Sequence, residues 1–255
     1  MDRLADKTAV ITGGAGGIGS GAARLFAAEG ANVLIVDLSE DALERTVRDI
    51  GSNRVSYCVA DVTQADDNER MFATAEERYG GVDAFLANAG IEGAVAPIVE
   101  TREEDFDRVI AVNVKGVWLG IKHAIPAMAK RGGGSIVVTS SVAGLSGTPG
   151  IAPYGTSKHA VIGLMRAAAR ECAPMNIRVN TVNPSPVETR MMRSLEAGMS
   201  PDDPEAARER IRGTVPLGRY AEPEDIAKVM LFLASDDAAF VTGSIYKADG
   251  GASAY

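Results

Sequence analysis

The 255-residue sequence carries 34 acidic and 26 basic side chains, a formal net charge of −8, and 46% of its residues are hydrophobic. These values are typical of a globular protein with one large core, and they exclude a disordered chain. The negative charge argues against a nucleic-acid partner, because phosphate backbones are bound by an excess of Lys and Arg. No run of about 20 apolar residues occurs, so no membrane partner is expected.

Short β-branched segments alternate with longer segments of helical periodicity along the chain. The predicted strands span 8–12, 32–37, 54–61, 82–88, 134–141, 177–183 and 244–249. Several are apolar nearly throughout, as expected for strands covered on both faces. The alternation predicts an α/β fold with a single domain over 1–255, built on a doubly wound parallel sheet of about seven strands flanked by helices.

The first predicted strand runs into TGGAGGIG, residues 12–19. Its glycines fit either G-x-G-x-x-G or T-G-x-x-x-G-x-G, and both patterns bring the backbone close to a pyrophosphate at the start of a helix. Glycines also serve ordinary tight turns, but the strand before and the helix after favour a dinucleotide. We therefore predict a Rossmann fold whose cofactor is contacted by Gly13, Gly17, Ile18 and Gly19.

Two acids stand at the ends of the next two predicted strands. A carboxylate at Asp37 can accept both hydroxyls of the adenosine ribose and would repel a 2′-phosphate, which predicts NAD rather than NADP. Asp61, followed by Val62, could contact the adenine. Capping of the following helix is an alternative role for either acid.

The segment APYGTSKHAV, residues 152–161, places Tyr154 and Lys158 four residues apart on a predicted helix, where they project side by side. Such pairs are often plain surface features. A free tyrosine titrates near pKa ~10, too high for a general base at neutral pH. The lysine ammonium and an oxidised nicotinamide are two cations that we expect to lower the pKa of this phenol by roughly two or three units.

Residues 184–216 interrupt the strand–helix alternation. They hold several prolines, a charged helical stretch and the apolar cluster Met191, Met192, Leu195 and Met199. Ligands of open α/β sheets bind beyond the carboxyl ends of the strands, so an insertion after a strand is placed to cover the site. We predict a substrate-covering lid, with a solvated surface excursion as the alternative.

Taken together, the motifs resemble those of the classical short-chain dehydrogenase/reductases. They are TGGAGGIG (12–19), DV (61–62), NAG (88–90), Asn113, SS (140–141), YGTSK (154–158), NPSPVET (183–189) and DGG (249–251). The resemblance implies a catalytic set of Asn113, Ser141, Tyr154 and Lys158. It also adds to the cofactor-binding residues Asn88, Ala89, Gly90, Tyr154, Lys158, Pro184, Val187 and Thr189.

The resemblance implies that Tyr154 exchanges a proton with the substrate oxygen while Ser141 hydrogen-bonds the same oxygen. Lys158 would also hold the nicotinamide ribose, and Asn113 would bind a water that links this lysine to solvent. Two positions depart from the family pattern: Ala87, where Asn is frequent, and Ser185, where Gly is usual. Pro186 pushes Ser185 to an extended conformation, which changes how the chain approaches the nicotinamide.

The predicted activity is hydride transfer between NAD and a small secondary alcohol or ketone, cyclic or otherwise apolar. A 3-oxoacyl-carrier-protein reductase, which normally uses NADPH, and a non-catalytic NAD-sensing protein are the alternatives. No metal site is predicted, since the two His and two Cys lack ligand spacing, and the cysteines fit reduced thiols in the cytoplasm. The family resemblance, with apolar helices predicted at 104–131 and 153–173, implies a homotetramer.

Overall fold

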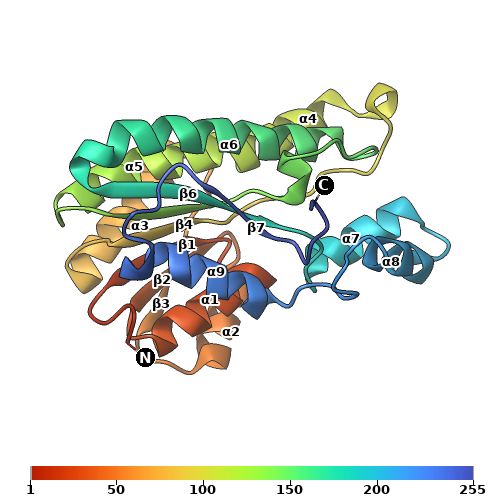
Figure 1. The fold of residues 1–255 in the computed structure, drawn as a ribbon. Helices are drawn as coiled ribbons and strands as arrows, with labels where there is room; N and C mark the ends of the chain where they lie inside the picture. Colours follow the sequence, from red (N-terminus) through yellow and green to blue (C-terminus); the bar gives the residue numbers. More distant parts are fainter. Residues whose placement is uncertain (1, 255) are drawn as a thin grey trace.

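The computed structural model describes residues 2–254, and within them seven strands form one fully parallel sheet in the order β3-β2-β1-β4-β5-β6-β7 (Figure 1). The strands are β1 Thr8–Thr12, β2 Asn32–Asp37, β3 Val55–Val59, β4 Ala84–Ala87, β5 Gly134–Thr139, β6 Ile177–Pro184 and β7 Ile245–Ala248. The predicted fold class is confirmed. Met1 and Tyr255, which the predicted domain includes, lie outside the described residues.

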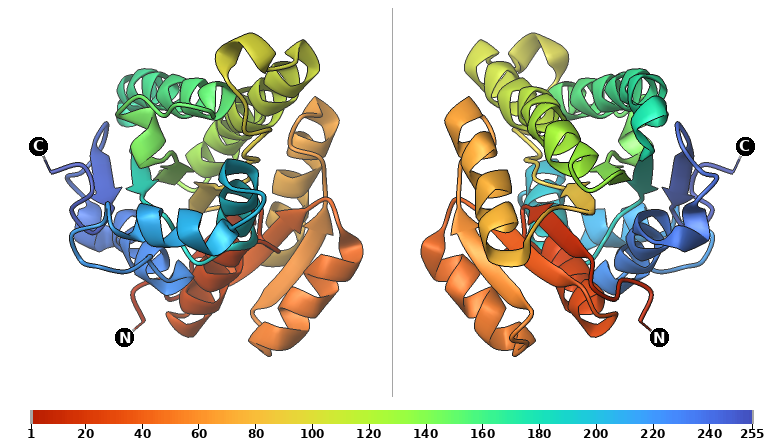
Figure 2. Two further views of the ribbon diagram at one scale, coloured as in Figure 1. Left: turned by 90° about the vertical axis from the view of Figure 1, so that its right-hand side faces the viewer. Right: turned by 90° about the vertical axis from the view of Figure 1, so that its left-hand side faces the viewer.

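Helices cover both faces of the sheet (Figures 1 and 2). On one face lie α1 Gly17–Ala28, α2 Glu40–Ile50 and α9 Pro223–Ala234. On the other lie α3 Ala65–Tyr79, α4 Glu103–Ile110, α5 Val117–Ala129 and α6 Ala152–Cys172. The strand order reverses direction between β1 and β4, and the carboxyl ends of these two strands therefore flank the point at which such sheets bind ligands.

The central parts of several strands are apolar because each face of the sheet packs against helices. Val10 and Leu34 belong to the core cluster under α3, α5 and α6, whereas Ile11 and Ile35 belong to the cluster under α1 and α9. Successive side chains of a strand point to opposite faces, so two adjacent apolar residues serve two different layers. Continuous runs such as NVLIVD follow from this double burial.

The segment predicted as one helix over 104–131 contains a change of helical geometry. A π-helical turn, Ala111–Gly116, joins α4 to α5 and carries Asn113 on its buried side. Gly116 lies so close to the loop after β3 that a Cβ there would fall 2.9 Å from Cγ2 of Val62. The wider turn redirects the chain, and π-turns of this kind are frequent at functional sites.

The segment 184–216 contains two helices, α7 Arg190–Met199 and α8 Pro204–Arg212, which project beyond the carboxyl end of the sheet (Figure 1). Thr189 caps α7 by accepting from the Met192 N–H at 3.4 Å, and Asp203 caps α8 by accepting from the Ala206 N–H at 3.0 Å. Among the described residues, no helix combines the length and apolar composition needed to cross a membrane.

Candidate active site

A cavity of about 500 Å³ opens at the carboxyl ends of the central strands. Fifteen of the predicted site residues line it: Gly13, Gly17, Ile18, Asp37, Asp61, Val62, Asn88, Ala89, Gly90, Ser141, Tyr154, Lys158, Pro184, Val187 and Thr189. The two that do not line it are Gly19 and Asn113. The structure therefore brings the predicted cofactor residues and three of the four predicted catalytic residues to one space.

The glycine-rich loop forms a close-packed cradle at the start of α1. Gly13 has a positive φ of 65°, and a Cβ there would lie 2.9 Å from the Ala89 Cα. A Cβ on Gly19 would fall 2.2 Å from the Gly13 carbonyl oxygen, so this glycine lets α1 pack against the loop and does not itself face the cavity. Gly16, the N-cap of α1, leaves the first N–H groups of the helix uncovered by a side chain. These features fit a dinucleotide pyrophosphate.

Asp37 lies at the rim of the cavity, where it ends β2. Its carboxylate accepts from the Leu38 N–H at 2.8 Å and from the Ala15 N–H at 3.2 Å. Two backbone donors fix the side chain between the glycine-rich loop and the next turn, so the orientation does not depend on a ligand. The negative charge is held at the position that the sequence predicts for the adenosine ribose.

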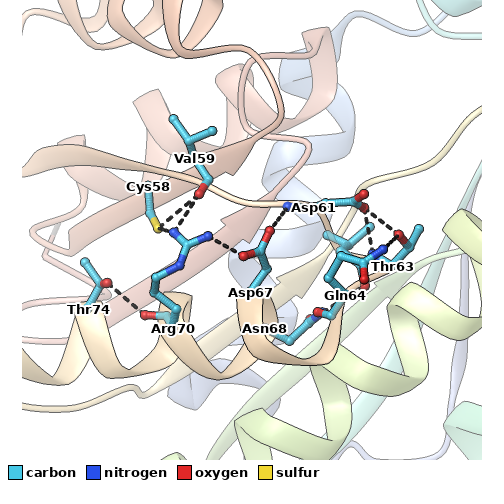
Figure 3. A network of polar contacts seen from close by, with 10 residues as sticks. Cys58, Val59, Asp61, Thr63, Gln64, Asp67, Asn68, Arg70 and Thr74 are labelled. Carbon is cyan, nitrogen blue, oxygen red and sulfur yellow. Dashed lines mark hydrogen bonds and ion pairs between the residues drawn. The ribbon is translucent and has the colours of Figure 1, made fainter.

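Asp61 does not cap the following helix, which was its alternative role, because the N-cap of α3 is Gln64; it closes a local turn instead. Its carboxylate accepts from the Thr63 N–H and from the Thr63 hydroxyl, both at 2.8 Å, although it also lines the cavity. Asp67 in turn accepts from the Asp61 N–H at 2.7 Å and pairs with Arg70, and the Asp61 N–H is the first cause of a lowered pKa at Asp67 (Figure 3). The turn that presents Asp61 and Val62 is thus braced from α3.

Asn88 ties together the ends of three strands beside the cradle. Its side-chain amide donates to the Thr12 carbonyl at 3.1 Å, and its oxygen accepts from the Thr139 hydroxyl at 3.1 Å. Ala87, the first departure from the family pattern, is buried in the core under α3 and α5, where a small apolar side chain fits. Ser185, the second departure, is 7% exposed, and its N–H donates to the Ala248 carbonyl at 3.4 Å.

Ser141, Tyr154 and Lys158 meet at the floor of the cavity, where β5 ends and α6 begins. Lys158 Nζ donates to the Thr139 carbonyl at 2.8 Å and lies 5.4 Å from the centre of the Tyr154 ring. Ser141 Oγ accepts from the Ala143 N–H at 3.1 Å and donates to the Pro184 carbonyl at 3.4 Å. The hydroxyl, phenol and ammonium thus share one space, and backbone partners fix the hydroxyl and the ammonium.

In the protein without a dinucleotide, burial dominates the pKa values of Tyr154 and Lys158. Burial raises the pKa of Tyr154 to about 12; a hydrogen bond with Ser141 opposes this rise and the Glu92 carboxylate adds to it. Burial also lowers the pKa of Lys158 to about 8. The rise at Tyr154 applies to the protein without a dinucleotide; the expected lowering of the phenol pKa by Lys158 and an oxidised nicotinamide together concerns the complex and stays a prediction.

Asn113 lies behind the cavity wall and is 1% exposed. Its oxygen accepts from the Ile91 N–H at 2.9 Å, and its amide donates to the Ile91 carbonyl at 2.9 Å and to the Ser157 hydroxyl at 3.0 Å. A Cβ on Gly90 would fall 3.3 Å from Asn113 Oδ1 and 3.5 Å from Lys158 Nζ. Glycine at position 90 thus leaves a small space between the amide and the ammonium.

The opposite wall comes from the segment 184–216. All four members of the predicted apolar cluster line the cavity, and Ile211 of α8 joins them. Sequence reasoning missed Ile211 and two residues of the facing wall, Val112 and Ile151. No local pattern marks these three, because each reaches the cavity through the packing of its helix or turn.

Comparison with known proteins agrees with this architecture. The family model described as "Enoyl-(Acyl carrier protein) reductase" matches residues 13–253. The chain is 37% identical over 252 residues to dehydrogenase/reductase SDR family member 4 from Homo sapiens, covering 98% of this chain and 88% of that protein. The chain belongs to the short-chain dehydrogenase/reductase family. It is also similar to a 3-oxoacyl-[acyl-carrier-protein] reductase, FabG, from Thermotoga maritima, with 42% identity over 251 residues and 98% of each chain covered.

A solved structure extends the family likeness to the whole fold. The crystal structure of levodione reductase has a TM-score of 0.95 and 35% sequence identity to this chain, covering 99% of this chain and all of that one. Members of the short-chain dehydrogenase/reductase family are oxidoreductases that use a nicotinamide cofactor and act on small molecules. The glycine cradle and the fixed Asp37 carboxylate are the features of this chain that fit such a cofactor.

Proposed function

We propose that this short-chain dehydrogenase/reductase transfers hydride between NAD and a small, apolar secondary alcohol or ketone. The observation that carries the proposal is the single cavity, which joins the dinucleotide cradle to Ser141, Tyr154 and Lys158 under an apolar wall. That wall, formed by α7 and α8, acts as the lid of the substrate site. Its methionine and leucine side chains favour an apolar substrate.

A bound nicotinamide supplies the hydride acceptor for an alcohol or the hydride donor for a ketone. Ser141 Oγ hydrogen-bonds the substrate oxygen and stabilises the charge that develops on it. Tyr154 Oη gives a proton to that oxygen or takes one from it. A phenol with a pKa of about 12 is protonated at neutral pH, so the protein by itself is prepared for the reducing direction. Lys158 and the space beside Gly90 lead towards Asn113, a route for returning the proton.

The choice of NAD over NADP rests on Asp37. A 2′-phosphate would place negative charge beside a carboxylate that two backbone N–H groups hold in position. Steady-state rates with NADH and NADPH on one ketone test this choice, and Asp37→Ser should reduce the preference. Higher kcat/KM with NADPH in the unaltered enzyme would reject it.

The activity itself is tested by following absorbance at 340 nm. Purified protein is incubated with NAD⁺ and a panel of secondary alcohols, and with NADH and the corresponding ketones. We expect turnover of apolar, including cyclic, members of the panel. Turnover confined to charged substrates, or none at all, would reject the proposed substrate class.

A 3-oxoacyl-carrier-protein reductase is the second candidate, and the 42% identity to the enzyme from Thermotoga maritima favours it. The formal charge of −8 opposes it, because a carrier protein is acidic and needs a basic docking surface. A 3-oxoacyl thioester presented on the carrier protein, with NADPH, is the deciding substrate. Faster reduction of this thioester than of free ketones would make the second candidate the correct one.

We also propose that the enzyme assembles as a homotetramer and acts in the cytoplasm. Trp118 on α5 is 46% exposed, and Phe240 is fully exposed, so the single chain leaves large apolar side chains uncovered. Both cysteines are free and buried, as expected for a reducing compartment. Light scattering at micromolar concentration tests the assembly, and a monomer would contradict it.

A further inference from the structure

Arg190, the first residue of α7, has an exposed guanidinium at the rim of the cavity. The neighbouring arginines are engaged: Arg193 and Arg208 both pair with Glu188, and Arg193 also pairs with Glu196. Arg190 forms no ion pair with any residue between positions 2 and 254. A cation at a cavity rim without a partner in the protein is free to bind an anion in that cavity.

The surroundings of Arg190 indicate which anion. Thr189 Cγ2 lies 2.9 Å from the point where a Cβ on Gly17 would stand, so the residue before Arg190 touches the first turn of α1. That turn presents the uncovered backbone N–H groups beside Gly16. The start of α7 and the start of α1 are thus in contact across the part of the cavity that fits a pyrophosphate.

The charge distribution of the cavity points the same way. Four charged side chains line it among the described residues: Asp37, Asp61, Lys158 and Arg190. Lys158 is 4% exposed and bonded to the Thr139 carbonyl at the floor, and the two acids repel an anion. A pyrophosphate carries two negative charges, and Arg190 directly follows Thr189, the residue that touches the first turn of α1.

We propose that Arg190, at the start of α7, binds the pyrophosphate of the dinucleotide together with the start of α1. This inference depends on one part of the proposed function, namely that a nicotinamide dinucleotide binds in the cradle. A guanidinium presents two parallel N–H donors to phosphate oxygens, so it adds a directional, charge-assisted contact to the helix N-terminus. Because Arg190 belongs to α7, dinucleotide binding also fixes the start of the helix that covers the substrate.

The test measures binding directly by NADH fluorescence titration, with no substrate present. Arg190→Gln should weaken NADH binding about tenfold and flatten the dependence of Kd on salt concentration, since one charge-assisted contact is lost. Arg210→Gln is the matched control, because Arg210 is an exposed arginine of α8 that does not line the cavity. We expect the control to bind NADH as the unaltered protein does.

Three further ligands show which part of the dinucleotide Arg190 contacts. In Arg190→Gln, the affinity for ADP-ribose, which keeps the pyrophosphate, should fall by the same factor as the affinity for NADH. The affinity for adenosine should not change. The affinity for NADPH should fall as much as the affinity for NADH. A loss of affinity confined to NADPH would show that Arg190 contacts the 2′-phosphate and would overturn the proposal. Unchanged NADH binding in Arg190→Gln would overturn it as well. Absence of alcohol turnover would reject the proposed function alone, since these affinities do not depend on a substrate.

Discussion

The floor and the lid of the cavity are held by different kinds of interaction. At the floor, Lys158 donates to the Thr139 carbonyl and the Ser140 hydroxyl donates to the Lys158 carbonyl at 2.9 Å, with both side chains buried. In the lid, Glu188 pairs with Arg193 and Arg208, and all three side chains are between 27% and 39% exposed. Both guanidinium groups lie within 6 Å of the Tyr220 ring centre, at 5.9 and 5.7 Å.

This difference matches what each region has to do. Breaking a buried hydrogen bond leaves an unsatisfied polar group, at a cost of about 1–3 kcal/mol, so the floor keeps one geometry. A partly exposed ion pair contributes about 0–1 kcal/mol, so the Glu188 pairs add little to the rigidity of the proposed lid. Proton transfer requires fixed distances, whereas admission of substrate requires movement. The predictions below alter first the floor and then the lid.

The largest effect is expected for Tyr154→Phe, which removes the hydroxyl that we propose exchanges a proton with the substrate. We expect kcat to fall roughly 1,000-fold while the Kd for NADH changes little. Stopped assays at high enzyme concentration measure the first quantity, and fluorescence titration measures the second. Tyr57→Phe, at an exposed phenol bonded to Glu40 and Glu44, is the control. Substantial turnover by Tyr154→Phe would remove this residue from its proposed role.

The next effect concerns the buried charge of Lys158. Because its folded pKa of about 8 lies below the ordinary value of 10.5, the unfolded chain binds this proton more tightly. The charged lysine therefore destabilises the fold below pH 8, and this penalty fades as the pH rises from 8 towards 10.5. Lys158→Met has no such penalty.

The measurement for Lys158 is urea unfolding of both proteins at pH 7 and pH 10. We expect the stability of the unaltered protein relative to Lys158→Met to increase with pH, by at most about 3 kcal/mol for the full shift. Other titrating groups are common to both proteins and cancel in the comparison. If the difference in unfolding free energy between the two proteins is the same at both pH values, burial of the charged Lys158 does not destabilise the fold.

A smaller effect is expected for Gly90→Ala. The added methyl group would enter the space between Asn113 Oδ1 and Lys158 Nζ, at 3.3 and 3.5 Å from these atoms. If protons pass through this space, kcat should fall about tenfold, a barrier increase of about 1.4 kcal/mol, with little change in KM for NADH. Gly163→Ala on α6 is the control, since nothing lies within 4 Å of its added Cβ. Equal kcat for both variants would argue against the route.

The smallest effect is expected in the lid. Glu188→Gln removes the shared partner of Arg193 and Arg208, which loosens the start of α7 against α8. The KM for the substrate should rise no more than about fivefold, and kcat should be nearly unchanged. Glu209→Gln, which breaks only the pair with Arg212 within α8, is the matched control. A loss in kcat comparable to that of Gly90→Ala would show that the lid, too, is part of the rigid machinery.

Much of the fold was predictable because its signals are local. The first two strands have the predicted bounds, 8–12 and 32–37, since an apolar run between polar or glycine-rich residues defines each. The third was predicted to span 54–61 and ends at Val59, because the chain bends to form the Asp61 turn. The π-turn at Ala111–Gly116 was not predicted; it ends at Gly116, which lies close to Val62, a residue far from it in the chain.

In the candidate site, too, some features were predictable from local sequence and others were not. The spacing of Tyr154 and Lys158 determines that they share one face of a helix, and the strand–glycine–helix order determines the cradle. The predicted lowering of the phenol pKa concerns the dinucleotide complex and stays a prediction, whereas burial raises this pKa in the protein alone. Local spacing shows which charges are near Tyr154, but the removal of water from around it depends on α6, β5 and the lid together.

The amino-acid sequence by itself determined the parallel sheet, the dinucleotide cradle and the identity of the groups at the cavity floor, because periodicity and short spacings act within a few residues. Only the tertiary structure decided that Asn113 bonds to Ile91 and Ser157, that Arg190 lines the cavity without an ion pair among the described residues, and that burial raises the pKa of Tyr154. These properties depend on segments far apart in the chain, and their energies are set by how completely those segments exclude water.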